Sequence, residues 1–262
     1  MKLEVKIRRQ VGKAVRDYSM IQEGDVIAIG VSGGKDSFTL LEILHSMSKR
    51  SPVKFTLKAL VIDQGFVDFK VEVLEEYLEA FGIPFHVEAV DTQSMEEKYG
   101  KPGGSFCSFC ARNRRGHLYR AAKNLGCNKI ALGHHRDDMV ETLMMNMFFN
   151  GTLKGMPAYL EGTGLGQGMQ LMRPLVYVPE SQIIEFAKAR AFPLISCACP
   201  TCGTHLQKRQ WVKHWLKDME NQVPGLKKNM LNSMQNVEAQ QLLMFDQSKA
   251  ELAEKLIGPR SV

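Results

Sequence analysis

The stretch Ser32-Gly33-Gly34-Lys35-Asp36-Ser37 decides the fold of this chain. It follows an apolar run over 26–31, typical of a buried strand, and precedes a helix-like run over 38–44. Glycines at a strand-to-helix turn let the backbone approach a phosphate closely, and the N–H groups of the helix N-terminus favour negative charge. Lys35 adds a positive charge. The spacing differs from G-x-x-x-x-G-K-[ST], so the stretch predicts a phosphate-binding loop of another kind.

The composition is that of a globular protein with a basic surface. The 262 residues, 44% of them hydrophobic, suffice for one α/β core with appendages. The chain lacks an apolar run of about 20 residues and a signal-like N-terminus, so we expect a cytoplasmic protein without a membrane span. The net charge of +6 gathers in patches that suit a polyanionic partner, although such runs are often only solvated faces. These patches lie at 6–16, 112–120, 208–213 and 227–228.

Apolar segments that are typical of strands alternate with helix-like segments. We expect strands at 26–31, 55–62, 84–90, 129–132 and 171–178, and helices at 2–18, 69–81, 112–125, 139–149 and from Pro179. This alternation predicts an α/β fold with a doubly wound parallel sheet. A glycine-rich loop is expected over 150–170, and a basic helical tail over 204–245. The predicted units are an N-terminal basic helix (1–20), the main domain (21–203) and a C-terminal helical tail that binds the polyanion (204–262).

The turn Gly133-His134-His135-Arg136-Asp137-Asp138 follows another predicted strand. Ligands of parallel sheets lie at the carboxyl ends of the strands, so this turn and the loop at 32–37 should share one crevice. The end of the second strand, Val61-Ile62, should lie beside them. Asp36 or Asp137 are candidate magnesium ligands, because magnesium prefers carboxylate and phosphate oxygens. Asp138, the next residue, is a candidate cap of the following helix.

Five of the six cysteines lie in two groups. Cys107-Ser108-Phe109-Cys110 forms one pair, and Cys199-Pro200-Thr201-Cys202 forms another beside Cys197. Two C-x-x-C pairs point to metal or sulfur chemistry. Structural zinc, a [4Fe–4S] cluster with one open iron and a redox thiol pair all remain open on the residues alone. Cys127 stands apart and is predicted to be a core residue.

These motifs together resemble the tRNA 2-thiocytidine biosynthesis family, whose members are ATP pyrophosphatases with a PP-loop. The resemblance spans roughly residues 18–237. Besides the loop at 32–37 and the turn at 133–138, it rests on Cys107 to Gly116, Asn146 to Phe149, Lys154 to Pro157, Arg173 to Leu175 and Ser233 to Val237. It implies a PP-loop fold of the adenine nucleotide alpha hydrolase type, and the ATP-dependent, [4Fe–4S]-dependent thiolation of cytidine 32 in tRNA through an adenylated base.

The resemblance also implies roles for particular residues. The cluster ligands would be Cys107, Cys110 and a third cysteine, either Cys202, as in the family's C-x-x-C-Gly, or Cys199, as in a related 2-thiouridine family. The catalytic residues would be Lys35, Asp36 and Asp137, with Cys107 and Cys110. The residues that bind ATP and magnesium would be Gly30, Ser32, Gly33, Gly34, Lys35, Asp36, Ser37, Val61, Ile62, Gly133 and Asp137.

The expected partners are tRNA and a sulfur donor such as a cysteine desulfurase, and a homodimer is compatible with the sequence. Arg112, Arg114 and Arg115 are expected to clamp tRNA phosphates or the adenylate. Two alternative functions stay open: a 2-thiouridine-forming tRNA sulfurtransferase of the related family, and a zinc-stabilised synthetase that adenylates another substrate. A non-enzymatic nucleic-acid-binding module would not need the loop at 32–37.

Overall fold

A computed structural model describes residues 2–66, 68–91, 106–195 and 204–243. Its centre is a six-stranded sheet in the order β3-β2-β1-β4-β6-β5. Neighbouring strands are parallel except for β5, which runs antiparallel to β6 at one edge. The strands are β1 (Val26–Gly30), β2 (Thr56–Asp63), β3 (Phe85–Ala89), β4 (Lys129–Ala131), β5 (Tyr159–Glu161) and β6 (Gln170–Met172). The mostly parallel, doubly wound sheet predicted from the sequence is confirmed.

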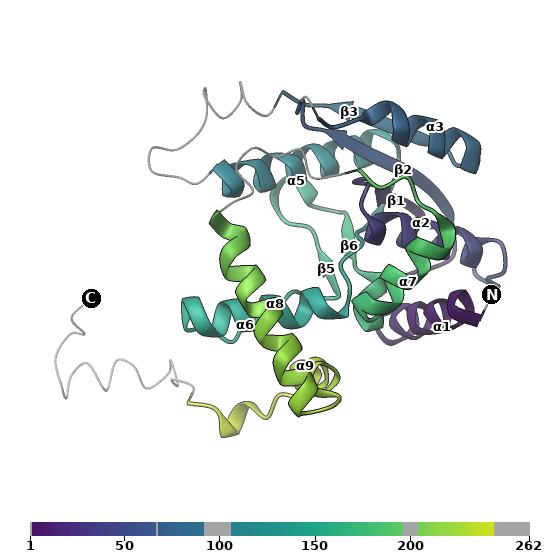
Figure 1. The fold of residues 1–262 in the computed structure, drawn as a ribbon. Helices are drawn as coiled ribbons and strands as arrows, with labels where there is room; N and C mark the ends of the chain where they lie inside the picture. The colour runs from purple at the N-terminus through teal and green to yellow at the C-terminus, as the bar shows by residue number, and fades with distance from the viewer. Residues whose placement is uncertain (1, 67, 92–105, 196–203, 244–262) are drawn as a thin grey trace, which may run out of the picture.

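Helices cover the sheet, and two more follow it in the chain (Figure 1). The domain helices are α1 (Lys2–Asp17), α2 (Lys35–Ser48), α3 (Val71–Phe81), α5 (Phe106–Asn124), α6 (Arg136–Asn150) and α7 (Glu180–Arg190). The tail contains α8 (Thr204–Gln222), α9 (Leu226–Gln235) and the short 3₁₀ turn η3 (Ala239–Gln241). Figure 1 shows α8 crossing α6, and the two helices pack together. Among the described residues, none of the helices could cross a bilayer.

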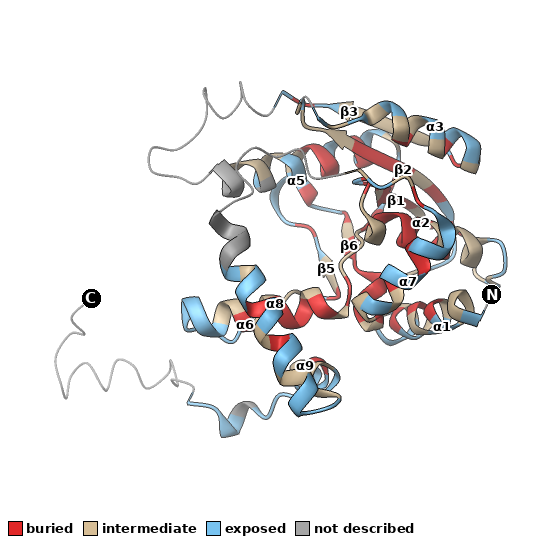
Figure 2. Cartoon of the chain, in the orientation of Figure 1, coloured by how far each residue is buried: buried red, intermediate tan, exposed pale blue. Residues whose placement is uncertain are grey.

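Alternate side chains of β1 enter two different hydrophobic clusters, as expected for a strand that is covered on both faces. Ile27 and Ile29 belong to the larger cluster, which also contains the buried side chains of α1, α2 and α7. Ala28 belongs to the smaller cluster, which it shares with Leu118 and Ala122 of α5. Figure 2 shows buried residues, in red, along the central strands and on the helices that pack against them. The core thus fixes α2 and α5 against the same central strands.

Two sequence predictions about the segment after α6 are wrong. The region 150–170 is not all loop, because β5 lies within it, followed by the 3₁₀ turn η1 (Gly164–Gly166). The strand expected over 171–178 ends at Met172, and the chain continues as the 3₁₀ turn η2 (Pro174–Tyr177). Pro174 has no N–H to donate to a neighbouring strand, and its fixed φ suits the start of a helical turn. The apolar run therefore had the composition of a strand but not its hydrogen-bonding capacity.

Candidate functional site

The loop between β1 and α2 leaves a helix N-terminus open to an anion. Gly34 occupies the N-cap position and has no side chain with which to cap the first N–H groups of α2. Gly33 has a φ of +77°, and a Cβ there would lie 2.9 Å from Cβ of Ile195. Ser37 fixes the turn, since its Oγ donates to Gly34 O at 2.9 Å and accepts from Ser32 N–H at 3.2 Å. The loop geometry therefore requires glycine and stabilises itself without using the helix N-terminus.

Lys35 is held beside this loop by two carboxylates. Its Nζ lies 3.2 Å from Asp36 Oδ1 and 3.2 Å from Glu180 Oε1, the latter at the start of α7. Burial lowers the pKa of Lys35, but Asp36 and Glu180 outweigh it and the pKa is raised. The lysine is thus charged at neutral pH and positioned at the helix N-terminus. This arrangement allows it to neutralise a phosphate.

The turn after β4 packs directly against the phosphate loop. A Cβ on Gly133 would lie 2.9 Å from the backbone C of Asp36 and 3.0 Å from Ser37 N, so only glycine permits this contact. The buried His135 places its Nε2 3.6 Å from Asp36 Oδ1 and 3.5 Å from Asp138 Oδ2. Asp138 Oδ2 accepts from His135 N–H at 3.0 Å, which confirms its interpretation as a helix cap. The structure thus brings the two sequence motifs together at the carboxyl ends of the neighbouring strands β1 and β4.

The two candidate magnesium ligands have different surroundings. Asp36 Oδ1 is buried and makes no hydrogen bond to any described residue, although Lys35 Nζ lies nearby. Asp137 is engaged through both oxygens: Oδ1 accepts from Lys227 Nζ at 2.9 Å, and Oδ2 accepts from Glu180 N–H at 2.9 Å. Burial raises the pKa of Asp137, but these two donors outweigh it and the pKa is lowered. A magnesium ion therefore fits Asp36 better, and a role for Asp137 as its ligand stays a prediction.

The remaining predicted nucleotide-binding residues line the ends of β1 and β2. Gly30 ends β1, and a Cβ on it would lie 3.0 Å from Cδ2 of Leu132. Val61 is fully buried in the larger cluster, so only its backbone faces the carboxyl edge of the sheet. Ile62 is partly buried and packs against the smaller cluster. These residues shape the floor of the site rather than supply chemistry.

The half-buried His134 and the buried Arg173 form a hydrogen-bonded pair beside the turn. Arg173 Nε donates to His134 Nδ1 at 3.3 Å, and its Nη1 donates to Pro157 O. Burial, followed by the charge of Arg173, lowers the pKa of His134 to about 4, so the imidazole is neutral at neutral pH. Burial, followed by the charge of Arg115, lowers the pKa of Arg173 to about 10. His134 thus serves as a hydrogen-bond acceptor that orients Arg173.

The first cysteine pair lies at the beginning of α5. Cys107 and Cys110 both belong to the first residues of this helix. Cys110 is partly buried, and its Sγ donates to Gln64 Oε1 at 2.8 Å, just beyond β2. Cys197, Cys199 and Cys202 lie outside the described residues. Within the described ranges, no group of three His, Cys, Asp or Glu side chains is placed to hold a metal. Cys127 is buried in the smaller cluster, which confirms it as a core residue.

The predicted basic surface divides into exposed and paired groups. Arg112, Arg114 and Arg115 are exposed on α5, and none of them forms an ion pair with the described part of the chain. Arg209 instead pairs with Asp138 at 3.0 Å and with Glu141 at 2.9 Å. Lys227 pairs with Asp137. Arg209 and Lys227 thus neutralise acids on α6, and the contribution of the patches at 208–213 and 227–228 to binding a polyanion stays a prediction.

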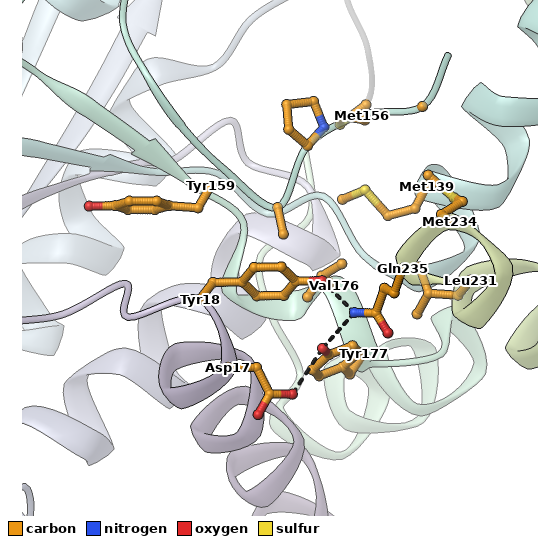
Figure 3. Close-up of a pocket in the computed structure, with 13 residues that line it drawn as sticks. Asp17, Tyr18, Met139, Met156, Tyr159, Val176, Tyr177, Leu231, Met234 and Gln235 are labelled. Atoms are coloured by element: carbon orange, nitrogen blue, oxygen red, sulfur yellow. Dashed lines mark hydrogen bonds between the residues drawn. The ribbon is translucent and has the colours of Figure 1, made fainter. Parts of the chain in front are cut away.

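A cavity of about 590 Å³ lies away from the phosphate loop, between α1, η2 and α9 (Figure 3). Its lining is rich in tyrosine and methionine, and none of the predicted nucleotide-binding residues contributes to it. Gln235 of α9 extends into it, and its Nε2 donates to the hydroxyls of Tyr18 and Tyr177. This contact fastens the end of α9 to Tyr18, just after α1, and to η2.

Sequence reasoning missed the residues that join the tail to the site. These are Glu180 itself and the ion pairs of Lys213, Lys227 and Arg209. One signal was available for Glu180, because an acidic residue directly after Pro179 is typical of a helix first turn. The lysines gave no signal, since their partners lie far away in the sequence.

An uncapped glycine loop at the carboxyl end of a parallel strand, with a lysine at the start of the next helix, is typical of α/β proteins that bind a phosphate at a helix N-terminus. The PP-loop domain family matches residues 3–217. The chain is 45% identical over 243 residues to a tRNA-cytidine(32) 2-sulfurtransferase of Geotalea uraniireducens, covering 92% of this chain and 95% of that protein. It is 46% identical over 239 residues to the protein of the same name from Geobacter metallireducens, covering 91% and 92%. The chain therefore belongs to the tRNA-cytidine(32) 2-sulfurtransferase family.

A solved structure shares the fold. The U34-tRNA thiolase NcsA from Methanococcus maripaludis, determined with its [4Fe-4S] cluster, superposes with a TM-score of 0.72 at 21% identity. The superposition covers 99% of this chain and 89% of that one. At this level of identity the likeness supports the architecture alone.

Proposed function

We propose that this protein is an ATP-dependent sulfurtransferase that converts cytidine 32 of tRNA to 2-thiocytidine. The observation that carries the proposal is the open N-terminus of α2, with Lys35 beside it and the turn at 133–138 packed against it. The relatives that match more than 90% of the chain bear the name of this activity. The protein would act in the cytoplasm, with a sulfur donor such as a cysteine desulfurase.

The chemistry follows from the poor leaving ability of the oxygen at C2 of cytosine. That oxygen attacks the α-phosphorus of ATP, an O–P bond forms, and pyrophosphate leaves as the α–β bond breaks. Sulfur at the sulfide oxidation level then attacks C2, the C2–O bond breaks, and AMP leaves with the former base oxygen. The N-terminal N–H groups of α2 would hold the phosphates, and Lys35 would neutralise the charge that develops on the departing pyrophosphate. Asp36 would hold magnesium on the same phosphates.

The cysteine pair on α5 fits iron–sulfur chemistry through its donor set, because thiolates are the preferred ligands of such clusters. Cys107 and Cys110 would be joined by Cys202 or Cys199. When bound, a [4Fe–4S] cluster with three cysteine ligands supplies an iron that is open to sulfur. The chain's own contribution is to hold this helix against β2 and β4, near the adenylation site.

The tRNA side of the proposal is supported by the exposed arginines of α5, which have no ion partner among the described residues. Arg112, Arg114 and Arg115 extend from the helix that begins with the cysteine pair. Guanidinium groups bind phosphates through two parallel hydrogen bonds. Bases in an anticodon loop are only partly stacked, so the target can leave its stack at a low energetic cost. Phosphate contacts on α5 would therefore place the loop beside both the cysteines and the phosphate site.

The test is anaerobic thiolation of tRNA by the purified protein, followed by mass spectrometry of the nucleosides. Wild type should form 2-thiocytidine, and Lys35→Ala should slow the reaction by about 100-fold, the usual cost of losing one preorganised electrostatic contact. Lys49→Ala, at the exposed far end of α2, is the matched control and should retain full activity.

The same experiment separates the alternatives. Formation of 2-thiouridine would assign the protein to the related reaction. A colourless, zinc-loaded protein that adenylates no tRNA would favour the synthetase alternative. Near-normal thiolation by well-folded Lys35→Ala would exclude the phosphate role of the lysine.

A further inference from the structure

One carboxylate is shared by two lysines that come from distant parts of the chain. Glu180, the first residue of α7, has its Oε1 3.2 Å from Lys35 Nζ of the phosphate loop. Lys213 Nζ of the tail helix α8 lies 2.8 Å from the same Oε1 and 2.7 Å from Oε2. Glu180 therefore links the tail to the lysine that we assign to the phosphates.

The Glu180 side chain is held where it is and kept charged. Its backbone N–H donates to Asp137 Oδ2 at 2.9 Å, which fixes the start of α7, and its side chain is only 15% exposed. Burial raises the pKa of Glu180, but Lys213 and Lys35 outweigh it and the pKa is lowered. A largely buried carboxylate of this kind needs a positive partner, because an uncompensated buried charge is strongly unfavourable.

Among the side chains that pair directly with Lys35 or Glu180, the charges balance only when Lys213 of the tail is included. Asp36 and Glu180 carry two negative charges, and Lys35 and Lys213 carry two positive charges. If Lys35 turned from Glu180 toward a phosphate without Lys213, the carboxylate would be left unpaired beside a second anion. With Lys213 present, Glu180 keeps a partner throughout the exchange.

We propose that Lys213 is a positioning residue for ATP binding: it neutralises Glu180, so that Lys35 can exchange this carboxylate for the phosphates of the nucleotide. The proposal rests on the proposed function, since it requires that the loop binds ATP. Lys213 does not touch the nucleotide and acts through Glu180. The tail helix α8 therefore tunes the affinity of the phosphate loop in addition to any contact with tRNA.

The test is the affinity of the full-length protein for an ATP analogue with a methylene group between the α- and β-phosphorus, measured by calorimetry with magnesium. Lys213→Met should weaken binding about tenfold, because a carboxylate near the phosphates loses its neutralising partner. Glu180→Gln should bind as tightly as wild type or more tightly, because it removes that negative charge. In the Glu180→Gln background, Lys213→Met should have no further effect.

Matched controls come from the same two helices. Glu185→Gln on α7 and Lys217→Met on α8 change exposed residues with no ion partner within the described ranges, and both should bind like wild type. Lys213→Arg keeps the charge and should also bind like wild type. Thermal unfolding of each variant separates lost affinity from lost packing.

Two outcomes overturn the inference. If Lys213→Met and Glu180→Gln weaken binding equally and their effects add, the ion pair between Lys213 and Glu180 only docks α8 onto α7. If Lys213→Met binds like wild type, the tail does not influence the loop. Failure of the wild-type protein to bind the analogue would instead refute the proposed function, and this inference with it.

Discussion

Asp137→Asn distinguishes a structural role for this residue from the magnesium role predicted from its motif. In the structure its carboxylate is 6% exposed and pairs with Lys227, which is 15% exposed. Replacing the acid leaves a largely buried lysine without its partner. Removing one member of a buried pair costs ~3–5 kcal/mol. We expect about 3 kcal/mol, the lower end of that range, because the asparagine oxygen can still accept from Glu180 N–H and Lys227 retains some solvent.

The assay is urea unfolding followed by tryptophan fluorescence. The two tryptophans of the chain, Trp211 and Trp215, both lie on α8, so the signal reports on the tail that Lys227 helps to dock. A loss of about 3 kcal/mol should lower the unfolding midpoint by about 1 M urea, since the slope for such a chain is roughly 3 kcal/mol per M. Lys227→Met should destabilise similarly. The double variant should lose less than the sum of the two, which is the signature of a direct pair.

The refuting result is equally specific. If Asp137→Asn unfolds at the wild-type midpoint while ATP-dependent thiolation is lost, the carboxylate acts on the nucleotide or its magnesium and the ion-pair interpretation is wrong. Asp218→Asn, an exposed position on α8, is the control for a change of charge alone and should alter neither quantity.

Three further predictions concern the cluster, the tRNA surface and the imidazole of His134. Cys202→Ser should lose most iron and visible absorption, whereas Cys199→Ser and Cys127→Ser should keep both, because thiolates hold such clusters. Replacing the three arginines within 112–115 by glutamine should weaken tRNA binding and reduce its salt-dependence slope by about 2–3, or roughly 0.7–0.9 per lost phosphate contact. The pKa of His134 is lowered to about 4 from 6.5, so the unfolded chain binds the extra proton and stability should fall as pH drops from 6.5 toward 4. The loss should reach at most about 3 kcal/mol and be absent in His134→Gln.

Each of these three predictions has a result that would contradict it. A Cys202→Ser protein that stays loaded while Cys199→Ser loses iron would make Cys199 the third ligand. Identical salt slopes for wild type and the arginine variant would remove α5 from the tRNA surface. A pH profile of His134→Gln that parallels wild type between pH 6.5 and 4 would assign the acid sensitivity to other groups.

The sheet was predictable because its strands carry strong local signals. The apolar run at 26–31 and the Ser-Gly-Gly turn after it fix β1 and the start of α2, and the same pattern holds at β4 and α6. The errors fell where local composition and pairing disagree. Pro174 stopped a strand that its apolar neighbours favoured, and β5 formed inside a glycine-rich region because β6 offered it an edge.

The site was predictable only where its residues lie next to one another in sequence. The loop at 32–37 and the turn at 133–138 can each be recognised from the spacing of residues within a short segment. The ion pairs of the tail do not, because Lys227 meets Asp137 across 90 residues and Arg209 meets Glu141 across 68. No pattern within either segment identifies such a partner. A basic stretch therefore looked like free charge from the sequence, although part of it is neutralised by acids on α6.

These ion pairs join the tail to the helices that surround the phosphate loop. Thr204, where α8 begins, follows Cys202 by two positions in the sequence, and α5 begins with the other cysteine pair. α5 is fixed to the central strands through the smaller cluster, and α8 is fixed to α6 and Glu180 through Arg209 and Lys213. Both cysteine-bearing segments thus lead directly into helices that are anchored near the phosphate loop. In the proposed reaction, adenylation of the base oxygen and attack of sulfur at C2 act on the same base, and this shared anchoring would hold the two sites close enough to act on it in turn.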